Sequence, residues 1–251
     1  MLIDILICTI DEGVLRVPNV LMPTRDDVRY VVSVQWTKEA VKEMVPKGLS
    51  EREDVEVVFL EGKGLSRNRN WALAHAKGDV VVIADDDNRY TAELIGNVKE
   101  AYGTHPESDV IHFQALDLEG QLLHPYPADY VSSVELTFRR RVTVRFDERF
   151  GLGSKDLCEG EEQVWMKDAR DAGYQIRYVA KPIVMTRKDT TGCHFLTNKR
   201  VQLSKGATFK YVYGTWEALW RSVKEAGWWM VHRGANPVPI FYRMLKGMVK
   251  V

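Results

Sequence analysis

Short apolar runs alternate with amphipathic stretches through the first two hundred residues of the chain. The apolar runs predict buried strands over residues 3–8, 28–34, 55–60, 80–84, 110–116 and 174–179, and a further strand within 135–144. Helical periodicity and end signals predict helices over residues 67–76, 91–102 and 161–172. Strands that alternate with helices are typical of a mostly parallel sheet with right-handed crossovers. The pattern therefore predicts an α/β fold.

The C-terminal segment, residues 199–251, has a different character. It holds ten lysines and arginines against two glutamates, a net charge of +8, whereas the other 198 residues carry −8. Apolar positions 216, 219, 220 and 223 form one helical stripe, and Trp228-Trp229 is expected to form an anchoring loop after it. A basic, aromatic segment favours contact with an anionic membrane. A helix that packs on the rest of the protein is the alternative.

The composition narrows the class of protein. With 251 residues, 45% hydrophobic and 28% charged, the chain is an ordinary globular protein rather than a disordered one. No apolar run reaches the roughly 18 residues of a membrane span, and the N-terminus is expected to form a buried strand, not a signal peptide. Three cysteines without paired spacing favour a reducing cytoplasm and give no zinc motif. An acidic main body argues against nucleic-acid binding.

The most informative motif is Asp85-Asp86-Asp87, which directly follows the apolar run 80–84. In open α/β sheets, ligands bind beyond the carboxyl ends of the strands. Adjacent carboxylates repel one another, and Mg²⁺ or Mn²⁺ would compensate them and bridge to substrate phosphates. In extended backbone, Asp85 and Asp87 point to one side, for the metal, and Asp86 to the other, for a sugar or ribose. A solvated acidic turn is the alternative.

A second motif, GLSRNRNWAL at residues 64–73, opens a predicted helix with Ser66 as its N-cap and Gly78 as its stop signal. Arg67 and Arg69 lie in its first turn, where the helix N-terminus already favours anions and arginine binds phosphate oxygens. These two arginines are therefore candidates for donor-phosphate binding. An ordinary polar surface helix is the alternative.

Two further signals come late in the chain. Glu161 and Glu162 open the helix 161–172, whose dipole favours ionised carboxylates, and one of them is a candidate general base. Simple helix capping explains them equally well. His194 follows residues 190–193 in an expected loop and is a candidate third metal ligand, although a lone histidine is more often structural. The sequence has no GxxxxGK[ST], GxGxxG or GxSxG motif.

Taken in order, these motifs resemble the GT-A glycosyltransferases, in particular family 2. GLSRNRNWAL resembles the family's G-x-S-x-x-R-N-x-A-L helix, and VVVIADDD its strand with an Asp-x-Asp motif. FDERFGLGS at 146–154 and GEEQVWMKDARDAGYQIRYVAKPIVM resemble the family's later segments. The resemblance covers residues 3 to about 195. It implies a GT-A catalytic domain over 1–198, with a Rossmann-like nucleotide-sugar half (1–100) and an acceptor half (101–198). The change in composition adds a basic, aromatic, helical appendage over 199–251.

The resemblance also implies roles for the candidate residues. Asp85 and Asp87 match the metal-binding pair, and Asp86 would touch the ribose or donor sugar. Glu162 stands where the family has the Asp that deprotonates the acceptor, and Glu161 matches the Glu before it. The implied reaction is a metal-dependent, inverting transfer of a hexosyl group from a nucleotide-diphosphate sugar, UDP-linked, to a glycan or lipid-linked acceptor.

The sequence also departs from the family. Gln35-Trp36-Thr37 replaces the acidic residue expected after the second strand, Glu162 replaces Asp, and Arg187 replaces a frequent His. The implied pathway is surface polysaccharide synthesis in the cell envelope, by a cytoplasmic protein peripheral to the inner membrane face. The alternatives are a sugar-phosphate nucleotidyltransferase, which lacks support because no Gly-rich N-terminal loop is present, and a non-catalytic glycan-binding module.

Overall fold

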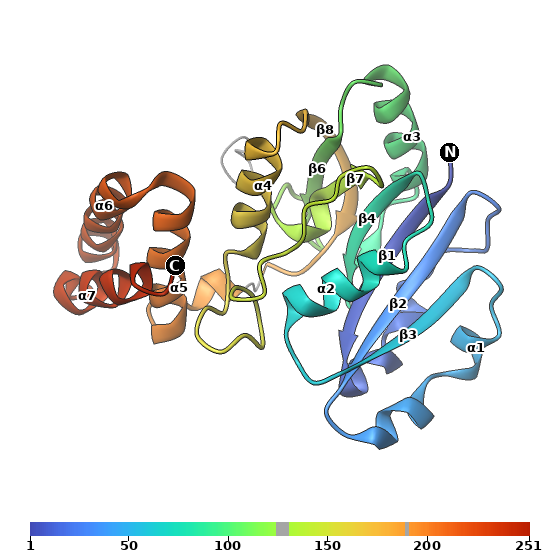
Figure 1. The fold of residues 1–251 in the computed structure, drawn as a ribbon, viewed down its shortest axis with the longest axis horizontal. Helices are drawn as coiled ribbons and strands as arrows, with labels where there is room; N and C mark the ends of the chain where they lie inside the picture. Colours follow the sequence, from blue (N-terminus) through green and yellow to red (C-terminus); the bar gives the residue numbers. More distant parts are fainter. Residues whose placement is uncertain (124–130, 189–190) are drawn as a thin grey trace. The chain divides into compact units, whose positions relative to one another are not determined.

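The computed structural model describes residues 1–123, 131–188 and 191–251. In these residues eight strands form one sheet in the order β3-β2-β1-β4-β7-β6-β8-β5 (Figure 1). Neighbouring strands pair in parallel except where β7 and β5 take part. The strands are β1 (Ile3–Ile10), β2 (Val28–Trp36), β3 (Val55–Glu61), β4 (Val80–Asp85), β5 (Arg89–Tyr90), β6 (Val110–Leu116), β7 (Leu136–Arg139) and β8 (Ile176–Met185). The predicted mostly parallel α/β sheet is confirmed.

The helices cover the sheet and form the C-terminal part of the chain. The α-helices are α1 (Lys47–Ser50), α2 (Leu65–Ala74), α3 (Leu94–Thr104), α4 (Glu161–Asp171), α5 (Lys199–Tyr213), α6 (Thr215–Arg233) and α7 (Pro237–Met248). Short 3₁₀ helices are η1 (Asp11–Leu15), η2 (Val17–Asn19), η3 (Glu39–Met44), η4 (Ser133–Glu135) and η5 (Thr191–His194). No α-helix in the described part of the chain is long and apolar enough to cross a membrane.

The chain forms two compact units, each built from several segments. The first unit holds the whole sheet and consists of residues 1–63, 67–145 and 168–188. The second unit consists of residues 64–66, 146–167 and 189–251. The sequence boundary at residue 198 stays a prediction.

The core of the first unit explains why its strands are continuous apolar runs. β1 is hydrogen-bonded to β2 along one edge and to β4 along the other, and its side chains are buried on both faces from Ile3 to Thr9. Ile3, Ile5 and Ile7 are fully buried on one face with Val80 and Val82, and Leu6 is fully buried on the other. A strand of this kind cannot alternate apolar and polar residues.

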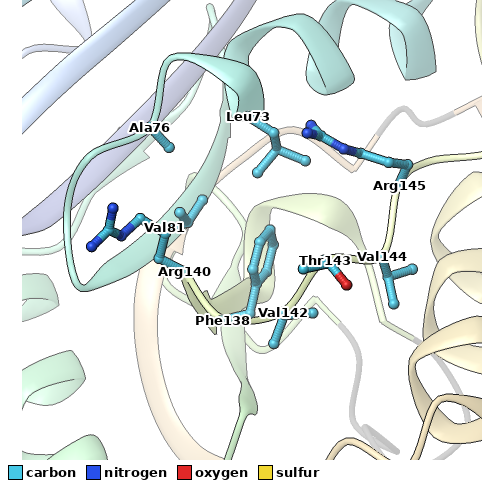
Figure 2. A pocket seen from close by; sticks show the side chains of 9 residues that line it. All are labelled: Leu73, Ala76, Val81, Phe138, Arg140, Val142, Thr143, Val144 and Arg145. Atoms are coloured by element: carbon cyan, nitrogen blue, oxygen red, sulfur yellow. The ribbon is translucent and has the colours of Figure 1, made fainter.

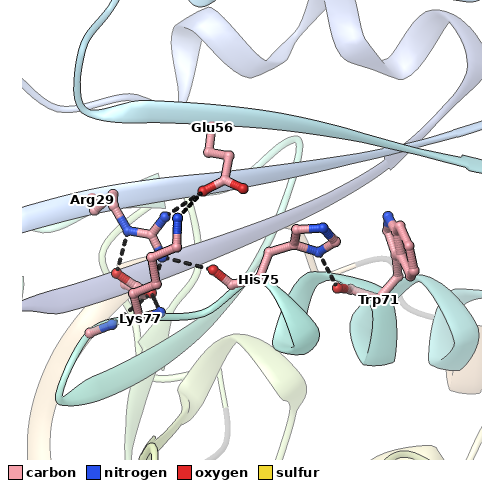
Figure 3. Close-up of polar contacts among 7 residues, drawn as sticks. Arg29, Glu56, Trp71, His75 and Lys77 are labelled. Carbon is pink, nitrogen blue, oxygen red and sulfur yellow. Dashed lines mark hydrogen bonds and ion pairs between the residues drawn. The ribbon is translucent and has the colours of Figure 1, made fainter.

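One buried carboxylate interrupts this apolar strand. The Asp4 side chain is fully buried and accepts bonds from Arg29 at 3.1 and 2.6 Å and from the amide of Gly78 at 2.9 Å. Arg29 also bonds Glu56 on β3 at 2.7 Å and the carbonyl of His75 at 2.9 Å (Figure 3). The guanidinium thus joins three strands to the segment after α2. Because every charge in this cluster has a partner, the buried charge is tolerated.

The second unit has its own core, formed by α5, α6 and α7 with the segment before α4. Buried side chains of Cys158, Phe195, Val201, Ala226 and Met244 meet there, and the Phe195 and Trp229 rings stack 5.0 Å apart. The expected helical C-terminal appendage is confirmed.

Three local expectations were wrong. Trp228-Trp229 does not form a loop, because α6 continues to Arg233 and ends at Gly234 in the left-handed conformation (φ 64°). Ser66 is not an N-cap, because α2 begins at Leu65 and the Ser66 hydroxyl donates to the Phe150 carbonyl at 2.7 Å. That helix also ends at Ala74, four residues before Gly78. The two-residue strand β5 carries no sequence signal and was not expected.

Two glycines allow α5 and α7 to approach closely. A methyl group at Gly206 would overlap the Met244 carbonyl, and one at Gly247 would overlap the Leu203 carbonyl. The neighbouring atoms are backbone, so they cannot move aside by changing a rotamer.

We expect Gly247→Ala to destabilise the protein by about 1–3 kcal/mol, because the added methyl group pushes α5 and α7 apart. Gly96→Ala is the matched control, since Gly96 lies inside α3 with no atom near the added methyl. The control should stabilise by about 0.5–1 kcal/mol. Urea unfolding checks both variants, and equal stability of Gly247→Ala and the wild type would contradict the close packing.

Candidate functional site

The predicted acidic motif lies at the carboxyl edge of the parallel strands. Cys8 of β1 pairs in register with Asp85 of β4, and Ile10 pairs with Gln35 of β2. The ends of these three strands therefore form one edge, which is where ligands bind in open α/β sheets.

The three consecutive carboxylates have different surroundings. Asp85 is half-buried and lies 3.4 Å from Nη2 of Arg69 on α2. Asp86 is buried and contacts Thr9, near the end of β1, and Arg16, which follows that strand. Asp87 is exposed. Asp85 and Asp86 thus meet cations from separate elements, as expected for adjacent residues in extended backbone.

Asp86 is bound by a guanidinium and a hydroxyl group. Nη2 of Arg16 lies 2.8 Å from Oδ1 and 2.9 Å from Oδ2 of Asp86, and the Thr9 hydroxyl also donates to this carboxylate. The hydrogen bonds to Asp86 raise the pKa of the Arg16 guanidinium. Asp86 was expected to contact ribose or donor sugar, and that role stays a prediction. Here its carboxylate ties the segment after β1 to the acidic turn.

Arg69 is buried, with 1% of its surface exposed. Its Nη2 donates to the Ser133 hydroxyl at 2.7 Å and faces Asp85. Burial beside this pair raises the pKa of the Cys8 thiol to about 12, so that thiol is neutral. The buried Arg69 guanidinium therefore lies where it offsets the negative charge of Asp85.

Arg67 has different surroundings from Arg69. It is exposed at the start of α2, and its Nη1 donates to the Glu61 carbonyl at 2.9 Å. The two predicted phosphate-binding arginines therefore differ in access to solvent, and only Arg67 is open to a ligand without rearrangement.

Asn68, between the two arginines, has a structural role that the sequence did not reveal. Its Nδ2 donates to the carbonyls of Thr9 and Ser33 at 3.0 and 3.2 Å, and Ser33 Oγ donates to its Oδ1 at 2.5 Å. The side chain thus joins the carboxyl ends of β1 and β2 to α2. The Asn68 side chain is only 2% exposed, and the sequence pattern does not reveal this burial.

Two other buried amides lie at the same edge and have unsatisfied atoms. Among the described residues, no partner is found for Nε2 of Gln35 or for either amide atom of Asn88, and both side chains are 2% exposed. Buried amides without partners are costly, so a bound ligand or water at these positions would recover hydrogen bonds.

Glu161 and Glu162 belong to the second unit, where they begin α4. Glu161 is buried, and its carboxyl group lies close to Gly151, which adopts φ 98°. Glu159, two residues earlier, was not singled out by the sequence. Its burial raises its pKa to about 7, and the charges of Glu162 and Glu225 contribute in the same direction. The second unit thus contains an acid that titrates near neutrality.

The described residues contain no group of three His, Cys, Asp or Glu side chains arranged to hold a metal ion. Asp85 and Asp87 remain as two carboxylates at one strand end. Two carboxylates suit Mg²⁺ or Mn²⁺, which take their remaining ligands from water and substrate phosphates. His194, at the end of η5, belongs to the second unit. Its role as a ligand stays a prediction.

A small pocket of about 120 Å³ lies at the other end of β4 (Figure 2). Leu73, Val81 and Phe138 form its apolar wall, and Arg140 and Arg145 stand on either side. Val81 is the second residue of β4, whereas the acidic motif follows its last residue. The pocket is therefore separate from the candidate site and contains none of the predicted residues.

With this geometry established, comparisons with known proteins are informative. Residues 21–141 match the model of a protein family described as Glycosyl transferase family 2. Residues 21–141 therefore form a glycosyl transferase family 2 segment. No curated protein sequence matches it significantly.

Among solved structures, TarS from S. aureus has the same fold as this glycosyltransferase. Residues 1–349 of TarS in complex with UDP-GlcNAc align with a TM-score of 0.64 and 15% identity, over 100% of this chain and 82% of that chain. The UDP complex of the same fragment aligns with a TM-score of 0.58 and 17% identity, over 95% and 73%. A longer TarS structure aligns with a TM-score of 0.57 and 17% identity, over 92% of this chain. This chain spans only 43% of that longer TarS. The expected family and GT-A fold are confirmed.

We expect Arg16→Ala to destabilise the glycosyltransferase by about 1–2 kcal/mol, because Asp86 would lose its cation while it stays buried. Arg25→Ala, which removes an exposed ion pair with Asp27, is the control and should change stability little. Urea unfolding at neutral pH measures the difference. Equal effects of the two substitutions would contradict a special role for the Arg16–Asp86 pair.

The pKa of Glu159 gives a second prediction. The Glu159 carboxyl group binds its proton more tightly in the folded protein than in the unfolded one. Its contribution to the free energy of unfolding is therefore largest below the ordinary pKa of 4.5 and falls as the pH rises towards about 7. The loss should reach up to about 3 kcal/mol in total. Unfolding experiments at pH 4.5, 6 and 8 should show this loss. Glu159→Gln should flatten the slope, whereas substitution of the exposed Glu53 by Gln should leave it unchanged. A slope that persists in Glu159→Gln would assign it to other groups.

Proposed function

We propose that the protein is a metal-dependent, inverting glycosyltransferase that uses a nucleotide-diphosphate sugar, UDP-linked, as its donor. The observation that carries the proposal is the acidic turn at the carboxyl edge of the parallel sheet. There Asp86 is neutralised by Arg16, while Asp87 stays exposed at the strand end. The match of residues 21–141 to glycosyl transferase family 2 supports the interpretation of this turn as the donor-binding site.

Donor binding is assigned to the first unit. Asp85 and Asp87 would hold a divalent cation, and Arg67 would meet the donor's diphosphate or base from the start of α2. The unpartnered Gln35 amide at the end of β2 offers a hydrogen bond to a nucleotide at the same edge. TarS, which has the same fold, has been crystallised with UDP and with UDP-GlcNAc, which supports a UDP-linked donor.

In the proposed reaction, an acceptor hydroxyl oxygen forms a bond to the anomeric carbon while the bond from that carbon to the diphosphate oxygen breaks. Glu162 takes the proton of the acceptor hydroxyl, and Glu161 beside it completes the acidic pair. Both lie in the first turn of α4, where the helix dipole favours ionised carboxylates. A bound cation would supply charge stabilisation to the leaving diphosphate.

Arg69 has a supporting role in this scheme. Its buried guanidinium compensates Asp85 from the α2 side. This arrangement places a fixed positive charge beside Asp85, so we assign Arg69 to positioning rather than to direct phosphate contact. The proposed acceptor is a glycan or a lipid-linked oligosaccharide of surface polysaccharide synthesis in the cell envelope. The basic, aromatic residues 199–251 support an acceptor at an anionic membrane.

The test is a thermal-shift experiment with UDP-GlcNAc and other nucleotide sugars, each with Mn²⁺ or with EDTA. A true donor binds the native state and raises the melting temperature by mass action. We expect a shift of a few degrees with one UDP-sugar and Mn²⁺ that EDTA abolishes. UDP release in the presence of glycan acceptors then measures turnover.

Two variants sharpen this test. Asp87→Asn should abolish the Mn²⁺-dependent shift, because it removes an exposed carboxylate from the proposed cation site. Asp26→Asn, at another exposed aspartate, should keep it. If no nucleotide sugar or cation shifts the melting temperature, the donor site is contradicted. Glycan binding without donor or metal would instead support a non-catalytic glycan-binding module.

A further inference from the structure

The C-terminal helices expose an unusual number of large apolar side chains. Of the eighteen exposed large hydrophobic residues in the described chain, ten lie between residues 213 and 249. Trp216 is 84% exposed and Trp220 is 59% exposed. Single exposed apolar residues are normal, but a concentration of this kind marks an interaction surface.

Four of the exposed apolar residues of α6 lie on one face of the helix. Trp216, Trp220, Val223 and Val231 are spaced by four, three and eight residues, which brings them back to the same face at every turn or two. We call these four residues the outer stripe. The buried residues of α6 are Ala218, Ser222 and Ala226, which occupy the opposite face. The fully buried positions of the helix thus hold small side chains, Trp229 packs against the core beside them, and the outer stripe presents large side chains outward.

Basic residues accompany the outer stripe. Lys224 lies one turn after Trp220 and is exposed, and Arg233 ends the helix. Neither takes part in an ion pair with the described residues. Glu217, one of the two acids of residues 199–251, is paired with Arg221 at 3.0 Å. Lys224 is therefore a cation beside the outer stripe that no acid of the described residues neutralises.

These features together favour a lipid surface over a second protein copy. Tryptophan prefers the boundary between lipid headgroups and acyl chains, where its ring is buried and its N–H remains hydrated. Lysine beside tryptophan on one face is typical of helices that lie in a membrane interface. Two copies of this chain would bring two segments of charge +8 together, and that repulsion opposes a dimer through α6.

We propose that the outer stripe of α6 is a docking surface for a bilayer that contains anionic lipids. The helix lies parallel to the membrane, with its aromatic side chains among the headgroups and Lys224 next to lipid phosphates. This surface is independent of the donor site, so its test does not depend on glycosyl transfer.

The test is co-sedimentation of the full chain with vesicles. Equal parts of phosphatidylglycerol and phosphatidylcholine form the anionic vesicles, and phosphatidylcholine alone forms the neutral ones. We expect binding to the anionic vesicles that weakens as salt is added, and much weaker binding to the neutral ones. The double variant Trp216→Ser/Trp220→Ser should bind about tenfold or more weakly, because it removes two interfacial side chains. Lys224→Glu should weaken binding about fivefold or more.

Trp71→Ser is the control, because Trp71 is a partly exposed tryptophan of α2 in the first unit and should leave vesicle binding unchanged. All replaced side chains are at least partly exposed, so circular dichroism and the melting temperature should stay as in the wild type. No binding by the wild type, or equal binding by the double variant, overturns the proposal. So does equal binding to neutral vesicles. If light scattering shows a wild-type dimer that the double variant dissociates, a second copy covers the outer stripe instead.

Discussion

Three consecutive carboxylates at the end of a buried strand repel one another, so each needs a nearby cation or exposure to solvent. Asp85 faces Arg69 of α2, Asp86 is bound by Thr9 of β1 and by Arg16 after it, and Asp87 is exposed to solvent. Without these cations, repulsion would raise the pKa values of the acids or disrupt the turn. The placement of α2 and of the segment after β1 follows from this constraint, and the remaining carboxylate at the strand end stays exposed for a ligand.

Helix α2 connects this edge of the sheet to the opposite one. Near its start, Asn68 bonds the ends of β1 and β2. Just beyond its end, the His75 carbonyl accepts from Arg29 in the buried cluster around Asp4 (Figure 3). Because the segment is bound at both ends, Arg69 has little freedom to move away from Asp85. Rigid placement of this kind matches the demand of a catalytic site for preorganised charge.

The sheet and the family could be predicted from the sequence, because buried strands and helix starts leave periodic and local signals. Strands over 80–84 and 110–116 were placed within one residue of β4 and β6. Pairings between distant residues left no such signal. Arg16 lies between the short 3₁₀ helices η1 and η2, a stretch without periodicity, and its partner Asp86 is 70 residues away. The burial that raises the pKa of Glu159 is likewise a tertiary property. The helix through Trp228 was missed because paired tryptophans resemble a loop anchor, although helical packing accommodates them.

The order of strands in the sheet has a consequence for synthesis on the ribosome. β5, which follows the acidic turn, pairs only with β8 in the described sheet, through Arg89 opposite Met185 and Tyr90 opposite Val184. Nearly one hundred residues separate the two strands, so the ribosome emits β5 long before its partner exists. During that interval the carboxylates beside β5 precede a strand that has no pairing partner. The turn that carries the three carboxylates is thus followed by a paired strand only after β8 has emerged.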